Sequence, residues 1–368
     1  MKLLELCTSD GFGGLELYAA KVADHYHRQG VSTLAVVQPG TLLDRRLAEQ
    51  GVPRRHIRVR AQYLPLLAAW RLGRWIRQDG IHTLHLHARR DLPLAVFARI
   101  FSGPGLRIVY TRQMALTRHK RGFWHRFLYR HVNVYLTITR RLQADAQRFL
   151  PLPAERIRTL YYGVPKPKRP TPETCTRMRE EFGLAPDRFT VAIFGRIEPG
   201  KGQHLLMAAI ERLVGEGHAI QAAIIGHAMS EAYREELEQR VAQAGLADHI
   251  RFAGFHPQPT TIMGCFDAIV LATKDETFGL VLAEAQRAGV AVIGSNAGGV
   301  PEIIEDGKTG LLFESQNAQD LTRCLRRLMT EVGLRERLAK TGEAFADRQF
   351  TEEGHFERLT GYLEGKAD

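Results

Sequence analysis

The chain has 368 residues, of which 44% are hydrophobic and 25% charged, as in ordinary soluble globular proteins. A chain of this length exceeds what one core usually supports, so two domains are expected. No apolar run approaches the ~18–20 residues that cross a bilayer. The first residues, MKLLELCTSD, contain too short an apolar stretch for an export signal. The composition therefore excludes a membrane-spanning chain and favours a cytoplasmic protein.

The net charge of +11 conceals an asymmetry between the two halves. Residues 1–170 contain 30 Lys and Arg against 10 Asp and Glu, which is +20, whereas residues 171–368 contain 21 against 30, which is −9. A half this basic should attract a polyanion or an anionic surface through a field that salt screens. The division of charge also indicates two separately built halves.

The four cysteines are Cys7, Cys175, Cys265 and Cys324, and they have no metal-ligand spacing. We interpret them as buried or idle thiols in a reducing cytoplasm.

Short β-rich runs alternate with longer amphipathic segments along the first half, a pattern typical of parallel sheets covered by helices. A strand at 2–8 precedes the turn GFGG (11–14), and apolar residues at helical spacing predict a helix over 15–30. Further strands are predicted at 32–39, 82–88, 107–111 and 134–139.

A second series of the same kind follows a proline-rich stretch. GVPKPKRPTP (163–172) contains four prolines and is the predicted linker. Strands are predicted at 188–195, 219–226, 249–254, 268–273 and 290–295, and 350–365 reads as an amphipathic helix. Two doubly wound units joined in this way imply a cleft, with ligands bound outside the carboxyl ends of the strands.

The loop GRIEPGKG (195–202) directly follows a predicted strand. Gly195 permits close backbone approach, Arg196 and Lys201 supply cations, and a helix starting near Gly202 offers free N–H groups. Together these features predict a diphosphate site, although a polar loop with incidental charges would also fit the pattern. The loop lacks the G-x-x-x-x-G-K-[ST] sequence of a P-loop.

The stretch ETFGLVLAEAQRAG (276–289) carries two carboxylates, Glu276 and Glu284. If the intervening residues were all helical, the two would lie about 12 Å apart. Glycosidase acid/base pairs lie ~5–9.5 Å apart, so a hydrolytic pair is not favoured. The spacing suits a ligand laid across a helix start, with each glutamate holding hydroxyls and backbone N–H groups meeting a phosphate. A helix-start carboxylate followed by a solvated one is the alternative.

These two motifs, followed by VAVIGSNAGGVPEIIEDGKTGLLF, resemble those of the retaining nucleotide-sugar glycosyltransferases of family 4, the glycosyl transferases group 1, of lipopolysaccharide-core or glycolipid type. The similarity is strongest over residues 190–315. It implies an α/β GT-B fold with two Rossmann-like, doubly wound domains facing a central cleft. Residues 1–165 would bind the acceptor, residues 166–350 would bind the nucleotide sugar, and the terminal helix, 351–368, would pack toward the first domain.

The resemblance also implies roles for individual residues. Glu276 and Glu284, which match the family's E-x7-E motif, would lie at the donor sugar and at the ribose hydroxyls, and Arg196 and Lys201 would neutralise the diphosphate that leaves. Transfer would proceed with retention, a donor phosphate oxygen serving as the base. No D-x-D motif occurs, so no metal or other cofactor is expected. The remaining donor-binding residues would be Gly13, Gly14, Gly195, Phe278, Gly279 and Leu280.

One position departs from the family pattern. A histidine usually follows the strand that here reads RIVYT, but this chain has Thr111-Arg112-Gln113. A glutamine can donate a hydrogen bond, and Gln113 is therefore retained as a catalytic positioning residue, but it cannot become cationic. His85 and His87 share one face of the preceding strand, where ordinary strand histidines are expected.

Basic and aromatic residues interleave in TRHKRGFWHRFLYRHV (117–132), while 54–60 and 64–77 add further cations and two tryptophans. This pattern favours a phosphorylated glycolipid or oligosaccharide acceptor and peripheral association with the anionic inner face of a membrane. Segment 64–77 would equally serve as a sheet-covering helix. No nucleic-acid motif is present. The predicted acceptor or membrane residues are Arg112, Arg118, Lys120, Arg121 and Trp124.

The expected reaction is transfer of a hexose from a nucleotide-diphosphate sugar, preferably a UDP-sugar, to a saccharide or glycolipid in lipopolysaccharide or other cell-envelope glycan synthesis. Alternatives are a GT-B-type nucleotide-sugar epimerase and a non-catalytic member that binds a membrane or partner. An NAD-dependent oxidoreductase is disfavoured because GFGG lacks the G-x-G-x-x-G spacing and no ribose-binding acid follows the second strand.

Overall fold

The computed structural model describes residues 1–366, which divide into two compact units. The first unit comprises Met1–Tyr161 together with the chain from Phe356 onward, and the second comprises Tyr162–His355. The division therefore falls at the start of the proline-rich stretch.

The first unit contains a 7-stranded sheet in the order β3-β2-β1-β4-β5-β6-β7, in which all neighbours are parallel. Its strands are β1 (Lys2–Cys7), β2 (Ser32–Val37), β3 (Arg54–His56), β4 (Thr83–Leu86), β5 (Arg107–Arg112), β6 (Val134–Thr137) and β7 (Ile157–Thr159). Its helices are α1 (Gly14–Arg28), α2 (Leu42–Glu49), α3 (Leu66–Asp79), α4 (Leu92–Ser102), α5 (Phe123–Tyr129) and α6 (Arg140–Phe149), with 3-10 turns η1 (Arg89–Asp91) and η2 (Ala154–Arg156).

The second unit contains a 6-stranded parallel sheet in the order β10-β9-β8-β11-β12-β13. Its strands are β8 (Phe189–Phe194), β9 (Ile220–Ile225), β10 (Ile250–Gly254), β11 (Ala268–Leu271), β12 (Ala291–Ser295) and β13 (Leu311–Phe313). Its helices are α7 (Pro172–Glu181), α8 (Gln203–Gly215), α9 (Glu231–Gln243), α10 (Leu280–Arg287), α11 (Ala318–Thr330) and α12 (Leu334–Gln349), with 3-10 turns η3 (Pro199–Lys201), η4 (Pro259–Thr261), η5 (Met263–Cys265) and η6 (Val300–Glu302).

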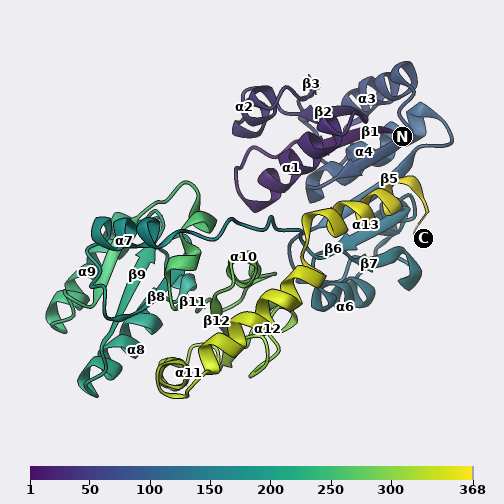
Figure 1. The fold of residues 1–368 in the computed structure, drawn as a ribbon. Helices are drawn as coiled ribbons and strands as arrows, with labels where there is room; N and C mark the ends of the chain where they lie inside the picture. Colours follow the sequence, from purple (N-terminus) through teal and green to yellow (C-terminus); the bar gives the residue numbers. More distant parts are fainter. Residues whose placement is uncertain (367–368) are drawn as a thin grey trace. The chain divides into compact units, whose positions relative to one another are not determined.

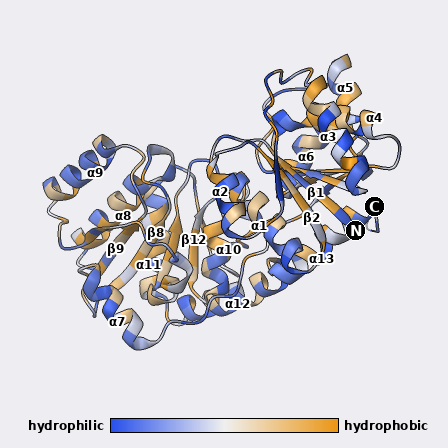
Figure 2. Ribbon diagram, turned by 90° about the horizontal axis from the view of Figure 1, so that it is seen from above, coloured by the Kyte–Doolittle hydropathy of each residue, from blue (hydrophilic) through white to orange (hydrophobic). Residues whose placement is uncertain are grey.

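Most central strands are buried because helices cover the sheets, whereas the edge strands β3 and β10 are largely half-buried or exposed. Every residue of β9, β11 and β12 is buried, as expected for parallel strands that lose solvent on both faces. In Figure 2 the labelled strands β9 and β12 are mostly hydrophobic, while the helices carry both hydrophilic and hydrophobic residues. The predicted α/β class with two doubly wound, Rossmann-like sheets is confirmed.

The last helix, α13 (Glu352–Glu364), contacts the first unit through its carboxyl-terminal part (Figure 1). The Thr83 hydroxyl donates to the carbonyl of Leu363 at 3.0 Å, and Arg107 Nε donates to the carbonyl of Tyr362 at 2.9 Å. The ring of Phe356 stacks on His25 with 3.5 Å between ring centres. These contacts fix the end of the described chain on the first sheet.

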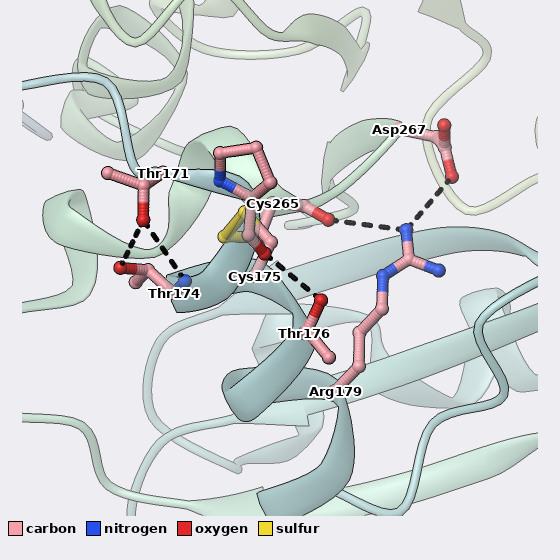
Figure 3. Close-up of a disulfide and its surroundings, with 8 residues drawn as sticks. Thr171, Thr174, Cys175, Thr176, Arg179, Cys265 and Asp267 are labelled. Carbon is pink, nitrogen blue, oxygen red and sulfur yellow. Dashed lines mark hydrogen bonds and ion pairs between the residues drawn. A yellow bond between two sulfur atoms is a disulfide. The ribbon is translucent and has the colours of Figure 1, made fainter.

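The interpretation of all four cysteines as idle thiols is wrong for two of them. Cys175 of α7 and Cys265 of η5 form a disulfide that closes a sequence separation of 90 residues (Figure 3). The guanidinium of Arg179 lies beside this bond, donating to the carbonyl of Cys265 at 3.5 Å. Sequence spacing could not reveal the pair because the fold alone brings these segments together. Cys7 and Cys324 are free and buried.

Across residues 1–366, no helix combines the length and the apolar character needed to span a membrane.

Candidate active site

The two motifs lie at the carboxyl ends of neighbouring strands in the second unit. GRIEPGKG follows β8 and ETFG follows β11, and these strands pair directly. Strand order changes direction between them, since β9 and β10 lie on one side and β12 and β13 on the other. Such a switch point is where open α/β sheets bind ligands.

A close backbone approach brings the two loops together at Gly202. This residue has φ +76°, and a Cβ there would lie 2.1 Å from the carbonyl oxygen of Ala272, just after β11. The N–H of Lys274 donates to the carbonyl of Gly200 at 3.2 Å. As a result, Lys201 Nζ lies 2.9 Å from Glu276 Oε2, which joins the cation of one motif to the carboxylate of the other.

A third segment, which sequence reasoning did not assign to the site, fixes the backbone of Glu276. Gly298, at φ +64°, approaches so closely that a Cβ would lie 2.0 Å from the carbonyl oxygen of Glu276. The next residue, Gly299, donates its N–H to that oxygen at 2.7 Å. The only signal in the sequence was the Gly-Gly pair in NAGGVPE, which follows the strand next to β11.

Arg196 belongs to the same loop as Lys201 but forms its ion pair with a different carboxylate, Glu198, and not with Glu276. Its guanidinium is 3.0 Å from Glu198, and the side chain is 51% exposed. Its carbonyl accepts a hydrogen bond from Gln203 Nε2 at 2.9 Å, which ties the loop to the first turn of α8. The backbone of Arg196 is thus held near the start of α8, while its guanidinium pairs with Glu198 and remains open to solvent.

Helix α10 begins at Leu280, so Glu276 precedes the helix and the 12 Å spacing for an all-helical stretch does not apply. Phe278 is only 2% exposed, and its ring packs edge-on against Tyr162 and Phe350. Its contribution to a ligand site is therefore limited to its backbone. Gly279 caps the helix at φ +100°, Leu280 is exposed, and Glu284 is half-buried on α10.

In the first unit, the GFGG loop leads into α1. Gly13 is the residue that caps the helix, and its N–H donates to Glu16 Oε2 at 2.8 Å. The capping carboxylate therefore occupies the backbone N–H of Gly13, a residue that the resemblance assigned to donor binding. Gly14 is the exposed first residue of α1.

Gln113 lies just beyond β5 and is 6% exposed. Its Nε2 is buried without a hydrogen-bond partner in the described part of the chain. A buried amide donor of this kind requires an explanation, and a ligand atom is one. Two residues earlier, the Thr111 hydroxyl lies 2.7 Å from His85 Nε2.

His85 and His87 are fully buried around Glu5 of β1. The carboxylate lies 3.0 Å from His85 Nδ1 and 2.6 Å from His87 Nε2. Burial alone would raise the pKa of Glu5, but the charges and hydrogen bonds of the two histidines lower it to about 2. Burial lowers the pKa of His87. The ionised Glu5 therefore anchors His85, which in turn holds Thr111 near Gln113.

Glu5, His85 and His87 are also the one group within residues 1–366 whose ligand atoms converge closely enough for a metal ion, all within 4.8 Å. Their mutual hydrogen bonds already explain the convergence, so a positioning role fits the cluster.

The predicted acceptor residues separate into two groups. Arg118, Lys120 and Trp124 line one cavity of the first unit. Arg112 donates instead to the carbonyls of Met114 and Ala115, and Arg121 donates to the carbonyl of Arg148 at 2.7 Å. Arg112 and Arg121 therefore brace loops of their own unit.

Two protein families match the sequence of this chain, one in each half. Residues 13–163 match the glycosyl transferase 4-like domain, and residues 176–345 match glycosyl transferases group 1. The parallel sheets, the switch-point site and these matches define a glycosyltransferase. The chain belongs to the group 1, family 4-like glycosyltransferases, as the motifs predicted.

Among curated relatives, the lipopolysaccharide core biosynthesis mannosyltransferase LpsB of Rhizobium meliloti is 28% identical over 286 residues, 75% of this chain and 79% of that protein. The D-inositol 3-phosphate glycosyltransferase of Actinosynnema mirum is 34% identical over 179 residues, 46% of this chain. The alignment spans only 42% of the Actinosynnema protein.

Solved structures support the GT-B fold over the whole chain. HepE of Anabaena, in complex with UDP, superposes with a TM-score of 0.87 at 21% identity and covers 99% of this chain and 100% of its own. The lipopolysaccharide outer core galactosyltransferase WaaB superposes with a TM-score of 0.77 at 17% identity, covering 100% of each chain.

Proposed function

We propose that this protein is a retaining glycosyltransferase that moves a hexose from a nucleotide-diphosphate sugar, preferably a UDP-sugar, to a saccharide or glycolipid acceptor. The observation that carries the proposal is the Lys201–Glu276 contact of 2.9 Å at the switch point of the second sheet. This contact supports the proposal because a sugar linked to a diphosphate needs a cation for the phosphates and a carboxylate for the hydroxyl groups close together. HepE structures in complex with UDP and with UDP-glucose favour a uridine nucleotide.

In the proposed reaction, an acceptor hydroxyl oxygen attacks the anomeric carbon on the face that the diphosphate leaves. The bond from carbon to diphosphate oxygen breaks, and the acceptor proton passes to a diphosphate oxygen. Lys201 and Arg196 stabilise the charge that develops on the leaving group, supported by the N-terminus of α8. Glu276 holds donor-sugar hydroxyls and Glu284 holds the ribose.

Gln113 is proposed to act as a positioning donor toward a substrate oxygen. Its buried Nε2 has no partner within residues 1–366, and an amide donor is neutral at every working pH. We also propose catalysis without a metal, because Lys201 and Arg196 would take the place of a metal ion at the diphosphate.

The acceptor is proposed to be a phosphorylated glycolipid or oligosaccharide of lipopolysaccharide or other cell-envelope glycan synthesis. LpsB is named for lipopolysaccharide core synthesis, and the Actinosynnema relative is named for inositol 3-phosphate. The basic first half, at +20, suits such an acceptor.

Peripheral association with an anionic membrane, from the cytoplasmic side, is part of the proposal. A run of exposed apolar side chains leads into α3, and Phe123 at the start of α5 is 87% exposed. Exposed apolar residues among arginines suit the interface of an anionic bilayer. The run comprises Tyr63, Leu64, Leu66, Leu67 and Trp70.

A direct test incubates the purified chain with UDP-, GDP- and ADP-sugars, with and without a phosphorylated core oligosaccharide, in the presence of EDTA. We expect nucleotide release and an α-linked product from an α-linked donor by NMR. Glu276→Gln should abolish the product. An epimerised sugar formed without acceptor, or full activity of Glu276→Gln, would refute the proposal.

A further inference from the structure

A basic cavity lies within the first unit, apart from the motifs of the second. Its volume is about 430 Å³, which is within the range of small-molecule sites. It is formed by the segment before α3, the turn η1, the start of α4, the loop before α5, and α5 itself. The lining residues that carry the argument are Arg89, Arg118, Lys120, His125, Trp124 and Tyr63.

The lining of this cavity contains cations but no carboxylate. Arg89, Arg118 and Lys120 form no ion pair with any residue of the described chain. Arg90 also borders the cavity, but it is neutralised by Asp10 at 3.0 Å. Three uncompensated cations around one cavity produce a strong local positive potential.

Lys120 is the most informative member of this group because it is buried, at 7% exposure. Its backbone N–H donates to the carbonyl of Phe149 at 2.9 Å, which fixes the residue in its loop. A lysine that is largely covered and lines a cavity without a counter-ion favours an anion there, because proteins normally pair such a group. Within residues 1–366 no carboxylate pairs with it.

The pKa values of Lys120 and His125 are both lowered, which agrees with several positive charges lying close together. Burial, followed by Arg118, Arg89 and Arg112, lowers the pKa of Lys120. Burial, followed by Lys120, Arg118 and Arg89, lowers the pKa of His125. An anion in the cavity would relieve the repulsion in both cases.

Aromatic rings provide the other half of the lining. Trp124 stacks on Phe127 with 5.7 Å between ring centres and an interplanar angle of 20°, which holds the indole in place. Tyr63 is 75% exposed at the edge of the cavity. Flat apolar faces beside cations suit a ligand that carries both C–H groups and negative charge, such as a sugar phosphate.

We propose that this cavity binds a phosphate group attached to the saccharide acceptor, with Arg89, Arg118 and Lys120 holding the phosphate and Trp124 and Tyr63 contacting the sugar. This inference rests on the proposed function, because it specifies the acceptor of that reaction. It also brings in Arg89, at the start of η1, and His125, in the first turn of α5, neither of which was among the predicted acceptor residues.

The test measures the affinity of the full chain for glucose 6-phosphate, glucose, glucuronate and inorganic phosphate by calorimetry. We expect glucose 6-phosphate to bind most tightly. Arg118→Ala and Lys120→Met should each weaken its binding about ten- to hundredfold, as expected when one charge-assisted hydrogen bond is lost. Lys120→Met keeps the side-chain volume, and Arg118 is exposed, so neither change should prevent folding.

The matched control is Arg45→Ala, which removes another exposed arginine of the first unit from α2, outside the cavity. UDP binding measured in parallel separates the two proposals. Arg196→Ala should weaken UDP binding and spare glucose 6-phosphate, whereas Arg118→Ala should do the reverse. If the wild type binds the sugar phosphate but not UDP, the donor-site proposal fails and the cavity proposal stands.

Several results would overturn the cavity assignment. One is unchanged glucose 6-phosphate affinity in Arg118→Ala and Lys120→Met. Another is equal or tighter binding of glucuronate or inorganic phosphate. A third is loss of binding to phosphatidylglycerol vesicles in these variants without loss of sugar-phosphate binding, which would assign the cations to the membrane surface.

Discussion

Gly298→Ala is expected to damage the donor site through the backbone of Glu276. A methyl group at this position would lie 2.0 Å from the Glu276 carbonyl oxygen, and real contacts below 3.0 Å essentially do not occur, so about 1 Å of movement is required. Alanine at φ +64° costs about 1–2 kcal/mol. Losing the hydrogen bond from Gly299 adds about 1 kcal/mol.

The total expected loss in the free energy of unfolding is therefore about 2–3 kcal/mol, measured by urea denaturation. A shift of about 1 Å at Glu276 should also lower kcat/KM for the sugar donor by about 100-fold. Gly307→Ala is the control, because Gly307 has a similar φ of +71° but a Cβ there would meet nothing within 4 Å. Equal effects of the two changes on stability and turnover would refute the reasoning.

Three further perturbations have defined outcomes. Lys201→Ala should weaken UDP binding at least about tenfold by calorimetry, yet change the unfolding free energy by no more than about 1 kcal/mol, because its contact with Glu276 is partly exposed. Reducing the Cys175–Cys265 disulfide, which closes 90 residues, should lower the unfolding free energy of the second unit by up to about 4–5 kcal/mol, measured with and without reductant. Burial raises the pKa of Asp91 to about 6, so stability should fall as pH rises from about 4 to about 6, and Asp91→Asn should remove that slope.

Each of these three predictions has its own control or contradicting result. Lys308→Ala removes an exposed lysine of the second unit and should leave UDP affinity unchanged. Cys175→Ser should abolish the response to reductant. For Asp91, the pKa in the folded state exceeds the ordinary value of 3.8. Between about pH 4 and pH 6 the folded state therefore holds a proton that the unfolded state has lost, so each rise in pH favours the unfolded state and stability falls. The fall ends as Asp91 of the folded state loses its proton near about pH 6. A wild-type stability that rises over the same interval would contradict the assignment.

The sheet strands with long apolar runs could be predicted from the sequence, because burial on both faces leaves a clear signal. Three strands were missed: β3, β7 and β13, each only three residues long at or near a sheet edge. Strands this short contain too few residues to establish a pattern. Residue spacing also could not show that α7 and η5 meet, and the disulfide was missed for that reason.

At the site, the motif residues were predictable but the contacts that hold them were not. Lys201 and Glu276 are 75 positions apart and meet only because β8 and β11 are neighbours. Arg89 was missed although it lies three residues beyond the end of β4, in the region to which the carboxyl-end rule draws attention. Arg89 is a candidate ligand-binding residue because it lines the same cavity as Lys120. The two residues are 31 positions apart, so their sequence positions did not connect them.

The Lys201–Glu276 contact also bears on how the enzyme would release its product. On the proposed donor geometry, a bound diphosphate would draw Lys201 away from Glu276, which it contacts at 2.9 Å in this structure. A complete sugar donor gives that carboxylate new partners in the sugar hydroxyls, whereas the nucleoside diphosphate left after transfer gives it none. The carboxylate then competes with the spent diphosphate for the same ammonium group. The ion pair would thereby favour departure of the product over departure of the substrate, and donor exchange would be faster in the wild type than in Glu276→Gln.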